Sequence, residues 1–239
     1  MGQIKLITFD LDNTLWNVES VVIKAEKRMR HWLDGQVPGF DVRFPPDVMA
    51  QLRNTVIEEN PALRHDLSKM REEILFRAIV ASAFSRKDAR TLARRAFEIF
   101  LDARHEVEYF DGALETLERL SQDYVLAALT NGNADFRRLK LGQYFDFGYS
   151  SASVGASKPA PDIFHAALKH AQTHPSEAVH VGDHLRDDVE GALGVGMHTV
   201  WVNLDRIEPP EEAATPTHTV NDLSEIPETI ERIGDASSD

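Results

Sequence analysis

Apolar and polar positions follow two different patterns along this chain. Residues 4–9 form a short, mostly apolar run that ends at Asp10, which is typical of a buried strand leading into a loop. Further apolar runs, separated by helix-like stretches, occupy residues 125–129, 178–181, 199–202 and 218–220. Such alternation predicts βαβ units and a parallel sheet.

From about residue 18 to residue 105 the apolar positions recur at helical spacing instead. This spacing predicts helices over residues 22–32, 47–58, 69–84 and 87–103. The simplest assembly is an α/β core with a Rossmann-like parallel sheet, made of residues 1–16 and 108–239, with residues 17–107 inserted as a helical cap domain. Because the insertion follows the carboxyl end of the first strand, where ligands bind in open α/β sheets, we expect the cap to act as a lid.

The composition of the chain limits the nucleophiles and the partners that it can have. The 239 residues are 42% hydrophobic, enough for a substantial core, and they include no cysteine, so any covalent chemistry must use an oxygen or nitrogen nucleophile. The net charge of −13, with scattered basic residues, argues against nucleic acid and anionic membranes as partners. No signal peptide or run of about 20 apolar residues is found. We therefore expect a cytoplasmic protein that acts on small molecules, in an oligomeric state that the sequence leaves open.

Polar clusters follow the apolar runs of the predicted sheet. Each cluster alone is compatible with ordinary turn or helix-start chemistry. The carboxyl ends of parallel strands meet at one edge, however, so four strands could bring together acids, a hydroxyl group and a lysine. Phosphoryl transfer to a carboxylate requires this set, since Mg²⁺ and a lysine offset the repulsion between two anions. The clusters are Asp10 with Asp12, Thr130 to Asn133, Lys158 before Pro159, and Asp183 to Asp188.

On these residues the sequence resembles the haloacid dehalogenase superfamily, which consists mostly of phosphatases. The four motifs of that superfamily occur in order at Asp10–Thr14, Thr130–Gly132, Lys158 and Gly182–Asp188. The helical insert after the first motif is similar to the cap of the C1 subclass, which carries a single helical bundle there. The resemblance covers essentially the whole chain.

The resemblance implies a role for each motif. Asp10 would be the nucleophile that forms an aspartyl-phosphate. Asp12 would protonate the leaving alkoxide and then activate water, which requires the chain to bulge after the strand so that both carboxylates face the substrate. Lys158 would neutralise charge on nucleophile and phosphate. The residues implied in phosphate binding are Thr130, Asn131 and Gly132.

The resemblance also implies a Mg²⁺ cofactor. Its ligands would be the Asp10 carboxylate, the Asp12 backbone carbonyl and Asp183. Asp188 would support this site by orienting a metal-bound water or Lys158, and Asp187 competes with it for that role.

The acid at Asp12 bears on which activity of the family this chain has. True dehalogenases of this family lack an acid at its position, because a halide leaves without a proton, so Asp12 favours phosphate esters. A phosphosugar mutase would keep both acids and is the nearest alternative activity. A non-catalytic binding module is a further alternative, although such modules usually lose a motif acid.

Substrate choice is expected to reside in the cap. Several polar cap residues gather around Pro61: Arg53, Arg64, His65, Asp66 and Arg71. Trp16 could stack on a substrate ring, although all of these residues could equally be solvated or structural. Together with the segment after Thr130, the cap resembles bacterial phosphatases acting on flavin mononucleotide and on 5-amino-6-(5-phosphoribitylamino)uracil, but departs from them in its second half. These two esters are the substrate hypotheses.

Overall fold

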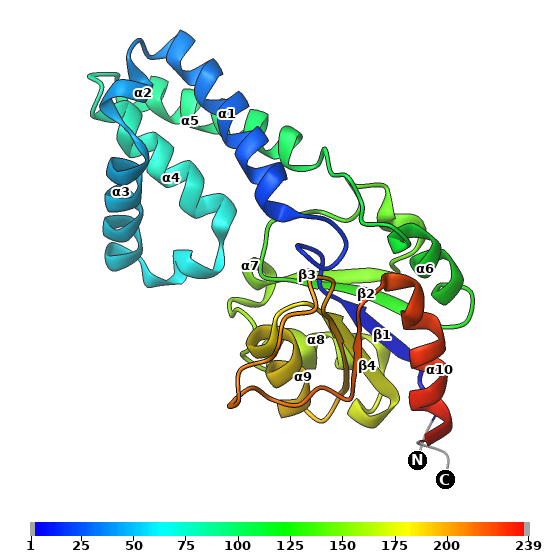
Figure 1. The fold of residues 1–239 in the computed structure, drawn as a ribbon. Coiled ribbons are helices and arrows are strands. Elements are labelled where there is room, and N and C mark those ends of the chain that lie inside the picture. The colour runs from blue at the N-terminus through cyan, green and yellow to red at the C-terminus, as the bar shows by residue number, and fades with distance from the viewer. Residues whose placement is uncertain (1–2, 237–239) are drawn as a thin grey trace. The chain divides into compact units, whose positions relative to one another are not determined.

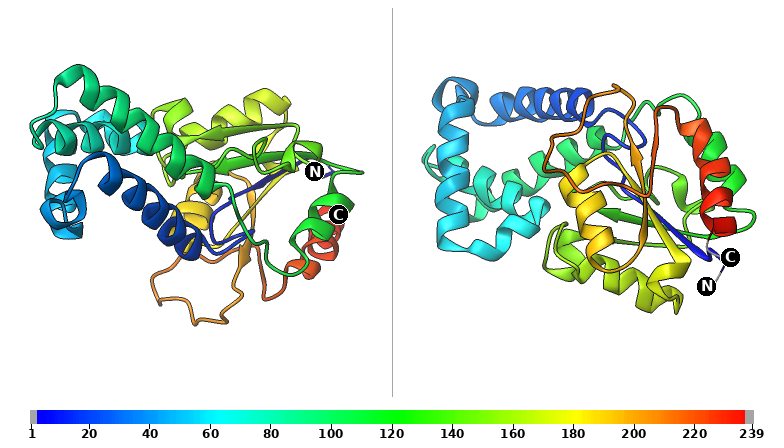
Figure 2. Two further views of the ribbon diagram at one scale, coloured as in Figure 1. Left: turned by 90° about the horizontal axis from the view of Figure 1, so that it is seen from above. Right: turned by 60° about the horizontal axis from the view of Figure 1, so that its bottom comes forward.

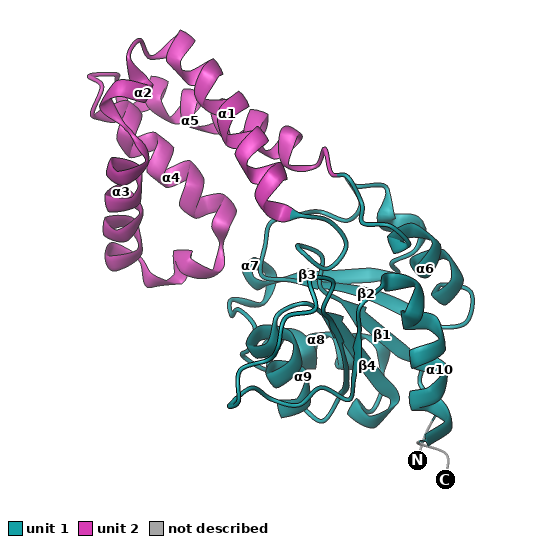
Figure 3. Cartoon of the chain, viewed as in Figure 1, with its two compact units in different colours: residues 1–17, 108–239 teal, residues 18–107 magenta. Residues whose placement is uncertain are grey.

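A computed structural model describes residues 3–236 of the chain, as shown in Figure 1. The chain forms two compact units, one of residues 1–17 and 108–239 and the other of residues 18–107, coloured separately in Figure 3. The outermost residues of the predicted core, 1–2 and 237–239, lie outside the described part. None of the helices between residues 3 and 236 has both the length and the apolar character needed to cross a membrane.

The first unit is built on a parallel sheet. Within the described residues the sheet has six strands in the order β3-β2-β1-β4-β5-β6, and each neighbouring pair is parallel. This confirms the predicted α/β class. The strands are β1 (Leu6–Phe9), β2 (Val125–Thr130), β3 (Phe147–Ser150), β4 (Ala178–Gly182), β5 (His198–Val202) and β6 (His218–Val220).

Strand β3 is absent from the sequence prediction. It holds a glycine and a serine among its four residues and lies at the edge of the sheet, so most of its side chains are only half-buried. An edge strand need not show the continuous apolar run of a buried strand. The apolar pattern therefore gave no signal for it.

Helices cover both faces of this sheet, α6 and α10 on one side and α8 and α9 on the other, as Figures 1 and 2 show. Side chains of β1, β2 and β4 pack against α8 and α9 in a core that includes Leu6, Leu129 and Phe164. The helices are α6 (Ala113–Leu120), α7 (Ser151–Val154), α8 (Asp162–Ala171), α9 (Gly191–Gly194) and α10 (Ile226–Ala236). Short helical turns lie at Leu141–Gln143, Pro175–Glu177, Leu185–Glu190 and Leu223–Glu225.

The second unit is entirely helical. Helices α1, α4 and α5 share an apolar core, to which α1 contributes Ala25, Met29 and Leu33 at a spacing of four residues. The predicted helix over residues 69–84 ends earlier, at Val80, because Ala83 adopts a left-handed backbone with φ 66° that an α-helix cannot continue. The helices are α1 (Val18–Gln36), α2 (Phe40–Arg43), α3 (Pro46–Glu59), α4 (Leu67–Val80) and α5 (Arg86–Arg104), with a 3₁₀ turn at Pro61–His65.

Candidate active site

The central strands bring distant polar residues to one edge of the sheet. Strand β1 pairs with β2 and β4 in a register that places Phe9 opposite both Ala128 and Val181. The residues that follow these three strands therefore lie next to one another. They are Asp10 after β1, Thr130 to Gly132 at the end of β2, and Gly182 with Asp183 at the end of β4.

Lys158 reaches this edge differently from the prediction. It does not follow a strand directly but lies in the loop between α7 and α8. Asn131 holds this loop in place: its side-chain Oδ1 accepts a hydrogen bond from the Lys158 backbone N–H at 2.8 Å, and its Nδ2 donates to the Lys158 carbonyl at 3.1 Å. The lysine is thus positioned by a side chain of the second motif.

The Lys158 ammonium group is buried and its three donors all have acceptors. Nζ lies 2.6 Å from Asp10 Oδ1, 2.6 Å from Asp188 Oδ1 and 2.8 Å from the Leu129 carbonyl oxygen. Burial opposes the charge, but Asp10 and Asp188 together hold the pKa of Lys158 above its ordinary value. Lys158 is therefore a fixed cation beside the Asp10 carboxylate.

Asp188 is the acid that anchors Lys158. Its Oδ1 also accepts from His180 Nε2 at 3.1 Å, and its Oδ2 accepts from the His184 backbone N–H at 2.9 Å. Although burial opposes ionisation, Lys158 and His180 hold the pKa of Asp188 below its usual range. A methyl group at Gly182 would overlap this carboxylate, so the strand end needs a glycine there. Every Asp188 oxygen thus has a donor.

Asp187 is placed elsewhere, although it is the neighbour of Asp188. Its carboxylate accepts a hydrogen bond from Asn131 Nδ2 at 3.2 Å and is only partly buried. Asp188, but not Asp187, is grouped with the Asp10 and Asp183 carboxylates among the described residues. The geometry therefore assigns the two adjacent acids to different partners.

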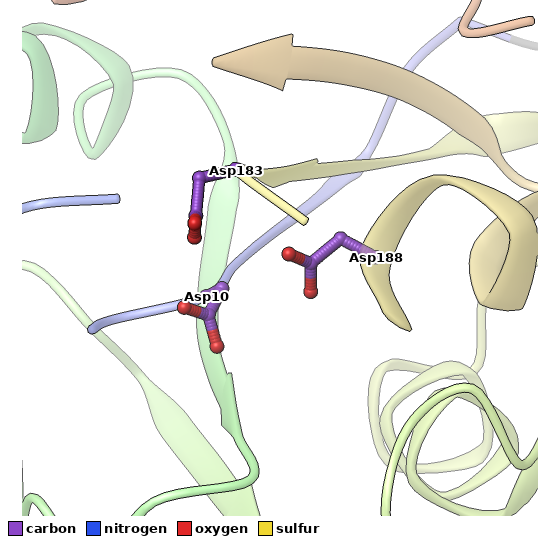
Figure 4. A group of neighbouring side chains, drawn as sticks. All are labelled: Asp10, Asp183 and Asp188. Atoms are coloured by element: carbon purple, nitrogen blue, oxygen red, sulfur yellow. The ribbon is translucent and has the colours of Figure 1, made fainter. Parts of the chain in front are cut away.

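Three carboxylates converge at the site, as Figure 4 shows for Asp10, Asp183 and Asp188. One oxygen from each lies within 4.8 Å of the others. The Thr14 hydroxyl joins two of them, lying 3.0 Å from Asp183 Oδ1 and 3.5 Å from Asp10 Oδ2. Burial raises the pKa of Asp10 well above its ordinary value despite the opposing effect of Lys158, and burial together with Asp188 raises the pKa of Asp183 to about 6.

The charges of this cluster favour a divalent cation. Three carboxylates lie near one ammonium group, and burial together with the neighbouring acids raises the pKa values of Asp10 and Asp183. Hard oxygen ligands of this kind suit Mg²⁺. The residues present therefore fit the ion that the resemblance implies.

The chain turns sharply after β1. Asn13 adopts a left-handed backbone with φ 62°, and its N–H donates to the Trp16 carbonyl at 2.8 Å. The turn leaves Asp12 partly buried, with Oδ1 accepting a hydrogen bond from Trp16 Nε1 at 3.0 Å. A methyl group at Gly132 would lie 2.5 Å from Asp12 Oδ2, so the second motif approaches this carboxylate closely.

Side chains of the second motif make hydrogen bonds within the protein. The buried Thr130 hydroxyl accepts a hydrogen bond from the Gly132 N–H at 2.8 Å. The Asn131 side chain binds the Lys158 backbone and Asp187. Its amide is therefore a brace for the lysine loop.

The Trp16 ring is not placed to stack on a substrate. It is 0% exposed and meets the Tyr109 ring edge-on, with centroids 5.9 Å apart. The interpretation of Trp16 as a stacking platform is therefore wrong, because a fully buried ring presents no face to a ligand.

The polar cap residues named in the sequence analysis differ in their contacts and in their exposure. Arg71 lies over the Phe100 ring, with its guanidinium carbon 3.8 Å from the ring centroid, and bonds to Glu26. Asp66 caps α4 by accepting from the Lys69 N–H at 2.9 Å. Both residues have structural partners within their own unit. Arg53 and Arg64 are exposed, and His65 is partly buried.

The sequence prediction assigned no individual role to two residues that the structure places at the site, His180 and Thr14. His180 is an ionisable residue inside the otherwise apolar strand β4, where it is buried, bonds to Asp188 and lies 2.7 Å from the Thr8 hydroxyl. Burial lowers the pKa of His180, which favours the neutral ring. Thr14 stands in the first motif and reaches Asp183. A polar residue within a buried apolar run is the pattern that could have identified His180.

The chain matches a family of hydrolases and is similar to known phosphatases. The family model of haloacid dehalogenase-like hydrolases matches residues 4–196. The chain is 31% identical over 202 residues to the 5-amino-6-(5-phospho-D-ribitylamino)uracil phosphatase YigB of Escherichia coli (strain K12), covering 84% of each chain. It is 36% identical over 132 residues to the glyceraldehyde 3-phosphate phosphatase of Pyrococcus furiosus, covering 51% of this chain and 54% of that one.

A solved structure resembles the chain over nearly its whole length. This is the crystal structure of a 2-haloacid dehalogenase from Pseudomonas syringae pv. Tomato DC3000, with a TM-score of 0.92 and 38% sequence identity. The match covers 96% of this chain and 99% of the other.

Proposed function

Because the chain belongs to the haloacid dehalogenase-like hydrolases, we propose that it hydrolyses small-molecule phosphate monoesters through an aspartyl-phosphate on Asp10. The observation that supports this most is the placement of Asp10 against the buried Lys158 ammonium group, with Asp12 two residues further along the same turn. Relatives named as phosphatases of small phosphate esters agree with it.

In the first half of the proposed reaction an Asp10 oxygen attacks phosphorus, and the bond from phosphorus to the ester oxygen breaks. Asp12 donates its proton to that departing oxygen, so that an alcohol leaves. In the second half Asp12, now a carboxylate, takes a proton from water, which attacks phosphorus and releases phosphate from Asp10. Lys158 offsets the negative charge at Asp10 throughout.

Mg²⁺ would be held by the Asp10 carboxylate, the Asp183 carboxylate and the Asp12 backbone carbonyl. When bound, it supplies positive charge beside the phosphoryl oxygens. Asp188 acts in support of this site, because both of its oxygens already accept hydrogen bonds from Lys158, His180 and the His184 backbone.

The name of the structural relative raises a second candidate, hydrolysis of a carbon–halogen bond. Asp12 distinguishes the two reactions, since an alkoxide needs a proton to leave and a halide does not. The acid held by Trp16 at this position therefore favours phosphate esters. A dehalogenase would release halide from 2-chloropropionate, which makes that compound a necessary part of any substrate panel.

The substrate is proposed from relatives. The first ester to test is 5-amino-6-(5-phospho-D-ribitylamino)uracil, on which YigB is named to act, followed by flavin mononucleotide and glyceraldehyde 3-phosphate. We propose that residues 18–107 act as the cap and set this choice, with exposed Arg53 and Arg64 as candidates for contact with the substrate.

The function is tested by phosphate release from these esters, sugar phosphates and nucleoside monophosphates, with and without Mg²⁺. We expect hydrolysis that is lost in EDTA and restored by excess Mg²⁺. Preference for the uracil ester or flavin mononucleotide would support the substrate proposal, and preference for another ester would replace it. Interconversion of phosphosugar isomers without phosphate release would identify a mutase, whereas no turnover of any compound would favour a binding module.

Acid is expected to weaken Mg²⁺ binding. The pKa of Asp183 is raised to about 6, so lowering the pH through this value places a proton on a proposed metal ligand, and metal and proton then compete for it. Affinity should be nearly constant above pH 7 and about tenfold or more weaker at pH 5. Calorimetric titration of the protein with MgCl₂ at both pH values measures this, and equal dissociation constants would contradict it.

A further inference from the structure

The buried Trp16 side chain makes one directional contact that involves the proposed proton-transfer group. Its indole Nε1–H donates to Asp12 Oδ1 at 3.0 Å, and the residue is 0% exposed. A buried indole N–H needs an acceptor, and a carboxylate provides a stronger one than a neutral carbonyl. The hydrogen bond therefore fixes the orientation of Asp12 as well as that of Trp16.

The indole cannot easily turn away from this contact. Backbone bridges link Trp16 to Asp12 and to Tyr109, and the Tyr109 ring packs edge-on against the indole at an interplanar angle of 79°. The Tyr109 hydroxyl in turn donates to the Leu139 carbonyl at 2.9 Å. Trp16 thus packs against a side chain that is itself anchored.

The second oxygen of Asp12, Oδ2, lies close to the turn at Thr130 to Gly132. A methyl group at Gly132 would lie 2.5 Å from Asp12 Oδ2 and 3.1 Å from the Thr130 hydroxyl. The indole therefore binds one carboxylate oxygen, while the other is directed toward the turn proposed to hold phosphate. With phosphate bound at that turn, Oδ2 would lie on the side of the departing ester oxygen that it has to protonate.

We propose that Trp16 is a positioning residue for Asp12, which it holds so that Oδ2 faces the leaving group. The proposal rests on the proposed function, since it takes Asp12 as the acid and base. Trp16 acts through Asp12 and does not touch substrate. Loss of its N–H should therefore slow the reaction only where the leaving group needs a proton.

The test is Trp16→Phe, which keeps an aromatic ring against Tyr109 and removes the N–H. Its kcat/KM is compared with wild type for an alkyl phosphate such as glycerol phosphate and for p-nitrophenyl phosphate, whose leaving group departs as a stable anion. This ratio reports only the steps up to loss of the alcohol, so the later hydrolysis of the aspartyl-phosphate does not affect it. We expect a loss of about tenfold or more for the alkyl ester and less than about threefold for p-nitrophenyl phosphate.

Two further variants make the result specific. Trp201→Phe removes another indole N–H of the site, which donates to the Asp183 carbonyl at 2.8 Å, and should affect both esters by the same factor. Tyr109→Leu keeps the Trp16 N–H but removes the ring that packs against the indole, and should show the selective loss in weaker form. If Trp16→Phe does not fold, as judged by its thermal transition, Tyr109→Leu decides the question.

An equal loss for both esters in the Trp16 and Tyr109 variants, or no loss for either, would overturn this inference and leave the proposed function intact. A wild-type protein that hydrolyses neither these two esters nor any other ester of the substrate panel would overturn the proposed function and the inference with it. A selective loss for the alkyl ester supports both.

Discussion

Replacing Asp10 by asparagine should abolish phosphate release, lowering kcat by about 10⁴-fold or more, as removal of a covalent nucleophile commonly does. The amide has nearly the size of the carboxylate, so the packing around it is preserved. It cannot attack phosphorus, and it offers Lys158 Nζ, 2.6 Å away in the wild type, no negative charge. The measurement is phosphate release in saturating Mg²⁺ with the best ester of the panel.

Asp187→Asn is the matched control for this variant. Asp187 also lies near the site, but its carboxylate bonds to Asn131 and not to Lys158. We expect it to retain activity within about tenfold of wild type, which is the low end of the loss expected for a residue that supports metal ligands without binding the metal. Comparable losses in both variants would mean that Asp10 has no special role, and more than about 1% residual activity in Asp10→Asn would exclude it as the nucleophile.

Replacing Lys158 by methionine should impair both stability and activity. The side chain is 2% exposed and its ammonium group lies between Asp10 and Asp188, so its removal leaves two buried carboxylates without their cation. Breaking a buried ion pair in this way costs about 3–5 kcal/mol. Loss of the charge beside the nucleophile should in addition lower kcat about 10²- to 10³-fold. Urea unfolding at pH 7 and phosphate release measure the two effects.

A second substitution separates these effects. Asp188→Asn in the Lys158→Met background removes one of the uncompensated charges and should recover part of the lost stability without recovering activity. Lys169→Met on α8 is the control, because Lys169 is exposed and should change the free energy of unfolding by less than about 0.5 kcal/mol. An unfolding midpoint for Lys158→Met equal to that of wild type would show that the two carboxylates do not depend on the lysine.

The stability of the site and the proposed catalysis thus place opposite demands on the same residues. Asp10, Asp183 and Asp188 are held within 4.8 Å of one another with a single ammonium group beside them. Neutral residues there would relieve the repulsion, but they could not perform the proposed attack on phosphorus or hold the proposed cation. Strain of this kind is common at functional sites and is supported by the surrounding core.

The sequence alone determined the α/β class and most of the sheet. Buried central strands such as Leu6–Phe9 and Ala178–Gly182 are short, continuous apolar runs with polar residues directly behind them, and such runs are informative without any knowledge of their neighbours. The same local pattern carried the motifs on which the family resemblance rests, and the family model matches residues 4–196. Strand β3 had no such pattern, because an edge strand is buried less completely.

Only the tertiary structure decided which side chains meet. Lys158 and Asp10 are 148 positions apart, and their contact depends on a loop that Asn131 holds in place. Asp187 and Asp188 are adjacent in the sequence, but the backbone directs their side chains to different partners, Asn131 and Lys158. The sequence left Trp16 either as a stacking platform or as a packing residue, whereas burial against Tyr109 turns its N–H toward Asp12. Periodicity records how residues follow one another along an element, but directional contacts between elements depend on how the whole core packs.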